Sequence, residues 1–311
     1  MSQTRFYEWN GYRCAYEVHS PQATAQPALL LVHPIGVGLS RRFWDRFCQE
    51  WSVQGYLQAI YNPDLLGCGE SAMPRAAYTP DDWAAQLQRL IEQVIQRPVV
   101  LVVQGALFPI AIRLVQRLQG QDWVQGLVLS GPPGWQLISQ ETSPLPQKLL
   151  WNLLFDSPLG RAFYRYARRE AFIESFSRRQ LFAEAADVDR EWLDTLQQGA
   201  ADPASRYAVF AFLAGFWRKN YTQAIEQIQQ PTLVVYGEAA SGIDRVSRGT
   251  LAPQRLEAYL QHMPNAEGEI IVGRNVMPYE STAEFVQVTG RWLARLSQGE
   301  LQTAGQSDNK P

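Results

Sequence analysis

Short apolar runs alternate with amphipathic stretches along most of this chain. The run ALLLV at 28–32 and the run VVLVV at 99–103 are each typical of a strand covered on both faces. Between such runs, apolar positions recur every three or four residues, as in a helix with one buried side. The expected strands are 4–9, 12–18, 28–32, 57–61, 99–103, 124–129, 232–236 and 269–272, and the expected helices are 43–53, 79–96, 106–119, 253–262 and 281–296. This alternation predicts an α/β fold with a mostly parallel sheet and helices on both of its faces.

Local sequence signals support two of these elements. Asn10-Gly11 separates the first two strands and predicts a tight hairpin, because both residues tolerate positive φ angles. Thr79, Pro80 and Asp82 suit the N-cap, the first position and the first turn of a helix.

The pattern changes after the sixth expected strand. From about 135 to 221 the chain has helical periodicity and many aromatic residues but no strand-like run. We therefore expect an all-helical cap over 135–221, inserted into a core formed by 1–134 and 222–297. Residues 298–311 are polar and are expected to form a disordered tail.

Composition narrows the class of protein. Hydrophobic residues make up 46% of the 311 residues and charged residues 19%, which suits a packed core. The net charge of −2 argues against nucleic acid as a partner, because phosphate binding needs clustered basic residues. Three cysteines without a paired motif indicate neither a zinc site nor a disulfide framework, and we expect no metal or cofactor. With no run of about 20 apolar residues, we expect a soluble, cytoplasmic protein.

Four motifs follow one another in the chain, and each lies at a strand end. They are LVHPIGVG at 31–38, DLLGCGES at 64–71, VQGAL at 103–107, and the pair PTLVVYGEAA at 231–240 with GRNVMPYE at 273–280. In this order they resemble the landmarks of the capped α/β-hydrolase superfamily, and the resemblance covers about 4–297. It implies an oxyanion loop after the third strand, a structural glycine loop, a nucleophile elbow of the G-x-S-x-G type, and two strand ends that supply the acid and the histidine.

The residues that would carry the chemistry are missing from these motifs. Gly105 stands at the nucleophile position, Ala240 at the acid position, and Asn275, give or take one residue, at the histidine position. Val103 and Leu107 occupy sites where the family's strained turn needs small residues. No Ser, Cys, Asp or Thr lies between 98 and 121, so a shifted alignment offers no other nucleophile. The resemblance is therefore to a member with a degenerate catalytic triad.

The oxyanion loop is the best preserved part of the expected site. Pro34 replaces the usual glycine, yet Ile35 or Gly36 could still offer a backbone N–H, and Ala106 could offer the second one. His33 could either brace this loop through hydrogen bonds or face the pocket. His262 belongs to a helix and is expected to be a surface or packing residue, and Ser71 is expected to brace its loop. A displaced acid could come from Glu238 or Asp244.

Two classes of function remain open. The first is a non-catalytic α/β-hydrolase-fold protein that binds a small apolar ligand in its pocket or a protein partner through its cap. The second is an enzyme in which His33, Asn275 and the N–H of Ala106 polarise a carbonyl group.

Arginines in the expected cap carry a further alternative. They are Arg161, Arg165, Arg168, Arg169, Arg178 and Arg179. These residues form either a solvated face balanced by Glu170, Glu174 and Glu184 or a surface for an acidic partner or anionic lipid, so peripheral membrane contact stays open.

Overall fold

The structure, a computed structural model, describes residues 3–20, 26–242 and 249–301. Its centre is an eight-stranded sheet in the order β1-β2-β4-β3-β5-β6-β7-β8. The strands are β1 (Arg5–Trp9), β2 (Tyr12–His19), β3 (Ala28–Val32), β4 (Ile60–Pro63), β5 (Val99–Gln104), β6 (Val124–Ser130), β7 (Thr232–Gly237) and β8 (Ala266–Ile271). β2 pairs antiparallel with both β1 and β4, and all the other pairs are parallel. The mostly parallel sheet predicted from the apolar runs is thus confirmed.

The predicted hairpin is also present. Asn10 and Gly11 have φ angles of 49° and 76° and join β1 to β2. Two strands differ from their expected bounds. β4 begins at Ile60, because its pairing with β2 begins there, and Leu57 stays exposed before it. β8 begins at Ala266, because it pairs with β7 from Thr232 onward as an edge strand that accepts polar residues.

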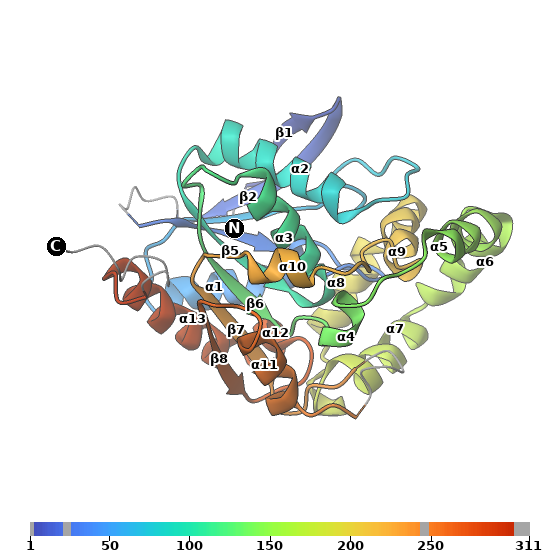
Figure 1. Cartoon of the computed structure of the whole chain (residues 1–311). Coiled ribbons are helices and arrows are strands. Elements are labelled where there is room, and N and C mark those ends of the chain that lie inside the picture. The colour runs from blue at the N-terminus through green and yellow to red at the C-terminus, as the bar shows by residue number, and fades with distance from the viewer. Residues whose placement is uncertain (1–2, 21–25, 243–248, 302–311) are drawn as a thin grey trace.

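Alternate residues of each strand point to opposite faces of the sheet. Both faces are apolar, and helices cover both of them. On one face, Leu30 and Leu101 pack in a hydrophobic core with α2 (Pro80–Leu90), α3 (Phe108–Arg117) and α11 (Ala252–Leu260). On the other face, Leu31 and Val102 pack with α1 (Asp45–Val53) and α13 (Thr282–Ser297). Figure 1 shows α2 and α3 on the side of the sheet opposite to α13. Shorter elements are η1 (Arg41–Trp44), η2 (Ile91–Ile95), η3 (Gly105–Leu107), α10 (Thr222–Glu226) and α12 (Met277–Glu280).

Thr79 caps α2 as predicted. Its side chain accepts a hydrogen bond from the Asp82 N–H, and the Asp82 carboxylate accepts one from the Thr79 N–H at 2.9 Å. These two bonds form a capping box, which satisfies donors that the first turn of a helix otherwise leaves unpaired.

Between 135 and 221, a range that the structure describes throughout, the chain forms helices and no strand. The elements are α4 (Trp135–Ile138), α5 (Pro144–Leu150), η4 (Trp151–Phe155), α6 (Pro158–Ala167), α7 (Glu170–Phe176), η5 (Ser177–Leu181), η6 (Ala185–Asp187), α8 (Arg190–Gly199), η7 (Pro203–Ser205) and α9 (Arg206–Leu213). We call this part the helical segment. It follows β6 as predicted, and most of it lies to one side of the sheet in Figure 1.

No helix in the described part of the chain is long and apolar enough to cross a membrane. Cys14, Cys48 and Cys68 are all buried and free. Of the predicted disordered tail at 298–311, residues 302–311 lie outside the described residues.

Candidate active-site region

The strand-to-helix turn after β5 keeps the backbone of a nucleophile elbow. Gly105 has a φ of +65°, and a Cβ placed on it would meet no atom within 4 Å apart from its chain neighbours. Val103 and Leu107, on either side of this turn, are large and buried. The turn forms with these neighbours because glycine adopts positive φ without a steric cost.

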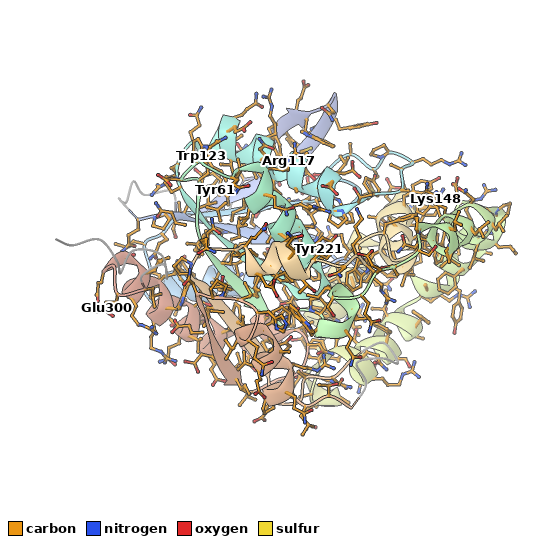
Figure 2. The ribbon with its side chains drawn as sticks, in the orientation of Figure 1. Tyr61, Arg117, Trp123, Lys148, Tyr221 and Glu300 are labelled. Carbon is orange, nitrogen blue, oxygen red and sulfur yellow. The ribbon has the colours of Figure 1, made fainter. Side chains whose placement is uncertain are left out.

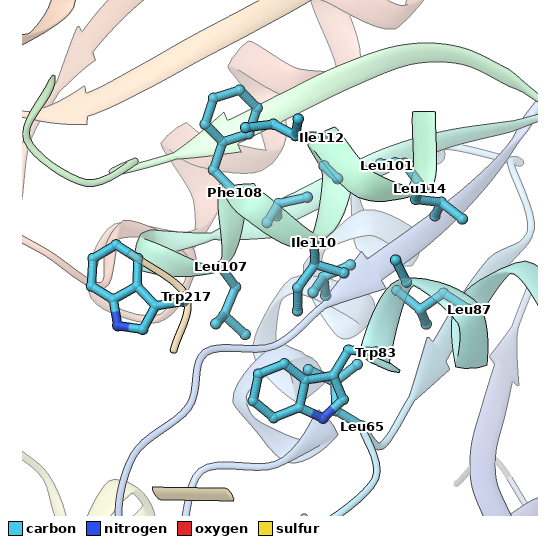
Figure 3. Close-up of a cluster of buried hydrophobic side chains, with 14 of the residues drawn as sticks. Leu65, Trp83, Leu87, Leu101, Leu107, Phe108, Ile110, Ile112, Leu114 and Trp217 are labelled. Carbon is cyan, nitrogen blue, oxygen red and sulfur yellow. The ribbon is translucent and has the colours of Figure 1, made fainter. Parts of the chain in front are cut away.

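The hydrophobic core continues from this turn into the helical segment. Leu107 belongs to the same buried cluster as Phe108 and Ile110 of α3 and Trp217 of the helical segment. Figure 3 shows Leu107 between the start of α3 and the indole ring of Trp217. A leucine at a site where the family needs a small residue therefore fills space between the two parts of the chain.

Asn275 stands at the position of the family's histidine, and its side-chain amide already donates two hydrogen bonds. The Asn275 Nδ2 donates to the backbone oxygens of Gln180 at 2.7 Å and Ser241 at 3.1 Å. The Asn275 N–H donates to the oxygen of Leu181 at 3.0 Å. Since an amide cannot accept a proton at neutral pH, this residue is no base, and its side-chain hydrogens bind the helical segment and the chain after β7.

Gln104, the residue before the apex of the turn, forms a hydrogen bond with Asn275. Its Nε2 donates to the backbone oxygen of Asn275 at 2.7 Å, while its Oε1 is buried without a hydrogen-bond partner among the described residues. Gln104 lies opposite Ser130 in the pairing of β5 with β6. Gln104 was not predicted from the sequence, although its position next to the apex residue was visible in the motif.

His33 braces its loop, which is one of the two roles left open for it. The ring is fully buried, its Nε2 accepts a hydrogen bond from the Leu65 N–H at 3.0 Å, and its Nδ1 lies 2.8 Å from the Pro34 oxygen. The Leu65 bond requires an unprotonated Nε2, so Nδ1 carries the proton and donates it to Pro34. Burial lowers the pKa of His33, which keeps the ring neutral. Both nitrogens are thus occupied by backbone groups.

The expected oxyanion loop touches the helical segment backbone to backbone. Gly38 has a φ of +79°, and a Cβ on it would lie 1.9 Å from the Leu196 oxygen of α8. A Cβ on Gly199 would lie 2.0 Å from the Gly38 oxygen. Only glycines fit this contact, which holds α8 against the loop.

The remaining oxyanion residues lie at the same edge of the sheet. Ile35 is buried, and Gly36 and Ala106 are half-buried. Because β3 and β5 are neighbours with Val32 opposite Val103, the loop and the elbow leave adjacent strand ends.

An arginine, rather than an imidazole, lies beside the acid position. Ala240 is buried, and the Nε and Nη2 atoms of Arg274 lie 2.9 and 2.6 Å from the hydroxyl oxygen of the next residue, Ser241. The Nη1 of Arg274 donates to the Arg179 oxygen at 2.8 Å. Arg274 was not identified from the sequence, although it is adjacent to the family's histidine position.

Glu238 and Asp244 are the two residues expected as possible displaced acids. Glu238 is exposed, and Asp244 lies outside the described residues. His262 packs on Trp135 with the ring centres 4.1 Å apart, and its Nδ1 lies 3.0 Å from the Ala258 oxygen. The packing role expected for His262 is therefore confirmed.

The glycine loop at 64–71 keeps its bracing contacts. The buried carboxylate of Asp64 forms an ion pair with Arg41 and accepts the N–H of Glu70 at 2.8 Å. The Ser71 hydroxyl donates to the Asp64 oxygen at 2.8 Å and accepts the N–H of Ala15 at 2.9 Å. Ser71 braces the loop, as predicted.

The comparisons with known proteins establish the family of this chain. The model of the alpha/beta hydrolase family matches residues 29–288, and the chain belongs to that family. A search of curated proteins gives no match.

Solved structures with the same fold carry the names of active enzymes. A serine hydrolase involved in carbazole degradation has a TM-score of 0.71 and 19% identity, with 94% of this chain and 99% of that chain covered. An esterase from Thermogutta terrifontis has a TM-score of 0.68 and 21% identity over 95% and 99% of the two chains. The epoxide hydrolase CorEH has a TM-score of 0.70 and 17% identity over 95% and 100%. At these identities the likeness establishes the fold alone.

Proposed function

We propose that this protein is a non-hydrolytic member of the α/β-hydrolase family that acts by binding. The observation that carries the proposal is Gly105, which places no nucleophilic atom at the apex of the elbow. Ala240 and Asn275 add no acid and no base. Because loss of a complete triad costs about 10⁶ in turnover, the backbone donors alone would leave little hydrolysis.

The alternative of an enzyme with unorthodox residues finds less support. It needs His33 or Asn275 to act on a substrate carbonyl. The two ring nitrogens of His33 hold Leu65 and Pro34, and the amide hydrogens of Asn275 hold two carbonyls. Such an enzyme would have to break these bonds first, and each buried bond is costly to lose.

The ligand class follows from the surroundings of the elbow. The space above Gly105 is open, and the three triad positions bear no charge, which suits a small apolar molecule held between the core and the cap. In this proposal the core is 1–134 and 222–297 and the cap is 135–221. A protein partner that docks on the cap is the other occupant that we consider. A cytoplasmic location belongs to the proposal, because three free buried thiols suit a reducing compartment.

Two measurements test this proposal. Turnover of a broad ester and lipid panel by the purified protein should not exceed that of the heat-denatured protein, while a serine hydrolase of the same fold serves as the positive control. Native mass spectrometry of the protein should detect a co-purified apolar molecule that denaturation releases. Turnover at an enzyme-like rate would refute the proposal, and a protein partner recovered in place of a small molecule would select the cap-docking form.

A further inference from the structure

The outer surface of the helical segment bears a concentration of exposed apolar side chains. They lie on α5, η4 and α6, and we call them the outer apolar face: Leu145, Leu149, Leu150, Leu153, Leu154, Leu159, Phe163 and Tyr166. Leu145, Leu149 and Leu153 follow one another at four-residue spacing and are 68%, 57% and 71% exposed. Residues at this spacing share one side of a helix, so the three leucines form a stripe.

The opposite side of the same helices is packed normally. Trp151, Phe155 and Tyr164 are buried against the rest of the helical segment. Figure 1 shows α5 and α6 at the end of the molecule farthest from β8. Single exposed leucines need no explanation, but eight exposed large apolar side chains on three successive helical elements indicate an interaction surface.

The elements that carry this face are rich in basic residues. Residues 144–169 include five basic residues and one acidic residue, whereas the whole chain has a net charge of −2. Lys148, Arg161 and Arg165 are exposed and have no ion-pair partner among the described residues. Figure 2 shows Lys148 at this outer edge of the molecule. The acidic residue, Asp156, is already bound by Arg75 at 2.7 Å.

The structure divides the arginines of the helical segment into two groups. Arg178 pairs with Glu174 at 2.8 Å, and Arg168 donates to the backbone oxygens of Ala200 and Ala201. Arg178 therefore belongs to a solvated face with its own acidic partner, and Arg168 braces the helical segment. Arg161 and Arg165, by contrast, flank the exposed side chains of α6 and remain available.

A basic recess opens beside the apolar face. Its volume is about 190 Å³, and it is lined by Arg75, Arg161, Arg206 and Tyr207 together with residues of the η4–α6 connection. Arg75 is paired with Asp156 there, and Arg206 donates to the Pro203 oxygen and the Tyr207 hydroxyl, so Arg161 is the guanidinium of the recess that has no partner among the described residues. Guanidinium groups bind phosphate oxygens through charge-assisted hydrogen bonds, so the recess suits a phosphate headgroup.

We propose that the outer apolar face docks this protein on the surface of an anionic phospholipid bilayer. The leucines enter the boundary between headgroups and acyl chains, and Lys148, Arg161 and Arg165 contact the headgroup phosphates. A second copy of the chain fits this face less well, because a two-fold contact would bring the arginines of one copy against those of the other. The proposal does not depend on whether the protein hydrolyses a substrate.

Vesicle sedimentation with the full chain tests the docking. The wild type should bind vesicles of phosphatidylcholine with phosphatidylglycerol and should bind vesicles of phosphatidylcholine alone much more weakly. Higher salt should weaken the binding, because it screens the basic residues. Soluble glycerol phosphate should not displace the protein from the vesicles.

Two double variants separate the apolar and the basic contributions. L149S/L153S should weaken binding about tenfold or more, because it removes two of the inserted side chains. R161Q/R165Q should weaken it about ten- to thirtyfold on anionic vesicles. Matched controls at exposed sites elsewhere are V53S/L57S for the leucines and R291Q for the arginines, and these should bind like the wild type. Circular dichroism should show all of these proteins folded, because the changed side chains are exposed.

Three results would overturn the proposal. The wild type could fail to bind anionic vesicles, the controls could lose as much binding as the face variants, or soluble glycerol phosphate could displace the protein. A fourth contradicting result could come from analytical ultracentrifugation without lipid. If the wild type is a dimer and L149S/L153S is a monomer, the face binds a second copy of the chain instead of a membrane.

Discussion

The loop 64–71 and the turn 103–107 both carry family motifs at the same edge of the sheet, and they differ in what they retain. The loop keeps the buried Asp64, its ion pair with Arg41 and the bracing hydroxyl of Ser71. The turn keeps only its backbone, with positive φ at Gly105 and no reactive side chain. The comparison teaches that contacts which stabilise a fold are separable from residues that perform its chemistry.

The largest effect is expected in the loop. Asp64→Ala leaves the buried guanidinium of Arg41 without its most buried partner, and we expect the free energy of unfolding to fall by about 3–5 kcal/mol. Urea unfolding followed by tryptophan fluorescence measures this loss. Asp81→Ala removes an exposed carboxylate and is the control, with an expected loss under about 1 kcal/mol. A loss at Asp64 as small as that of the control would show that the loop is not a stabilising unit.

The contact between the oxyanion loop and α8 gives the next effect. Gly38→Ala places a Cβ 1.9 Å from the Leu196 oxygen and also strains a positive φ. Gly55→Ala is a matched control, because its φ is +81° and no atom lies within 4 Å of the new Cβ. The control should lose about 1–2 kcal/mol of unfolding free energy, and Gly38→Ala should lose a further 1–3 kcal/mol, roughly, from the clash. Equal losses would mean that α8 moves freely away from the loop.

A serine at the apex tests whether the turn lacks only its nucleophile. Gly105→Ser should cost about 1–2 kcal/mol of unfolding free energy, because it puts a side chain at positive φ in open space. Ester turnover should remain at the wild-type background, since neither Asn275 nor Ala240 can activate the hydroxyl. Gly105→Ala has the same strain without a hydroxyl and is the control. A large gain in turnover for the serine variant alone would show that a base has been overlooked.

The smallest effect concerns pH and His33. Burial lowers the pKa of His33, so the unfolded chain binds a proton more readily than the folded one. The sign follows: the free energy of unfolding should fall as pH drops below about 6.5, by up to roughly 1.4 kcal/mol per pH unit, and should be unaffected by His33 above it. Asp64 and Arg41 act on the pKa of the ring with opposite signs, Asp64 raising it and Arg41 lowering it, and burial outweighs both.

The variant His33→Gln isolates this contribution. Its unfolding free energy should be lower at neutral pH but should decline less between pH 6.5 and 5 than that of the wild type. Other groups, such as Asp45 with its pKa raised to about 6, are common to both proteins and cancel in the difference. Parallel pH profiles would contradict the neutral, buried assignment of His33.

Much of the fold was predictable, because apolar runs such as Ala28–Val32 and cap residues such as Thr79 act locally. The first residues of β4 and β8 were not predictable, because β4 begins where it pairs with β2 and β8 begins where it pairs with β7. The vacant triad positions could be identified from the motifs. The contact of Gly38 with α8 and the hydrogen bonds from Arg274 to Ser241 could not be predicted from the sequence. Each joins two segments whose distance in space depends on the whole fold.

The most direct test of the central claim is covalent labelling with a fluorophosphonate probe, followed by intact-protein mass spectrometry. The probe reacts with a serine only when a base activates it, so the protein should gain no mass under conditions that label a serine hydrolase of the same fold completely. A stoichiometric gain in mass, mapped to a single serine and lost on denaturation before labelling, would contradict the account.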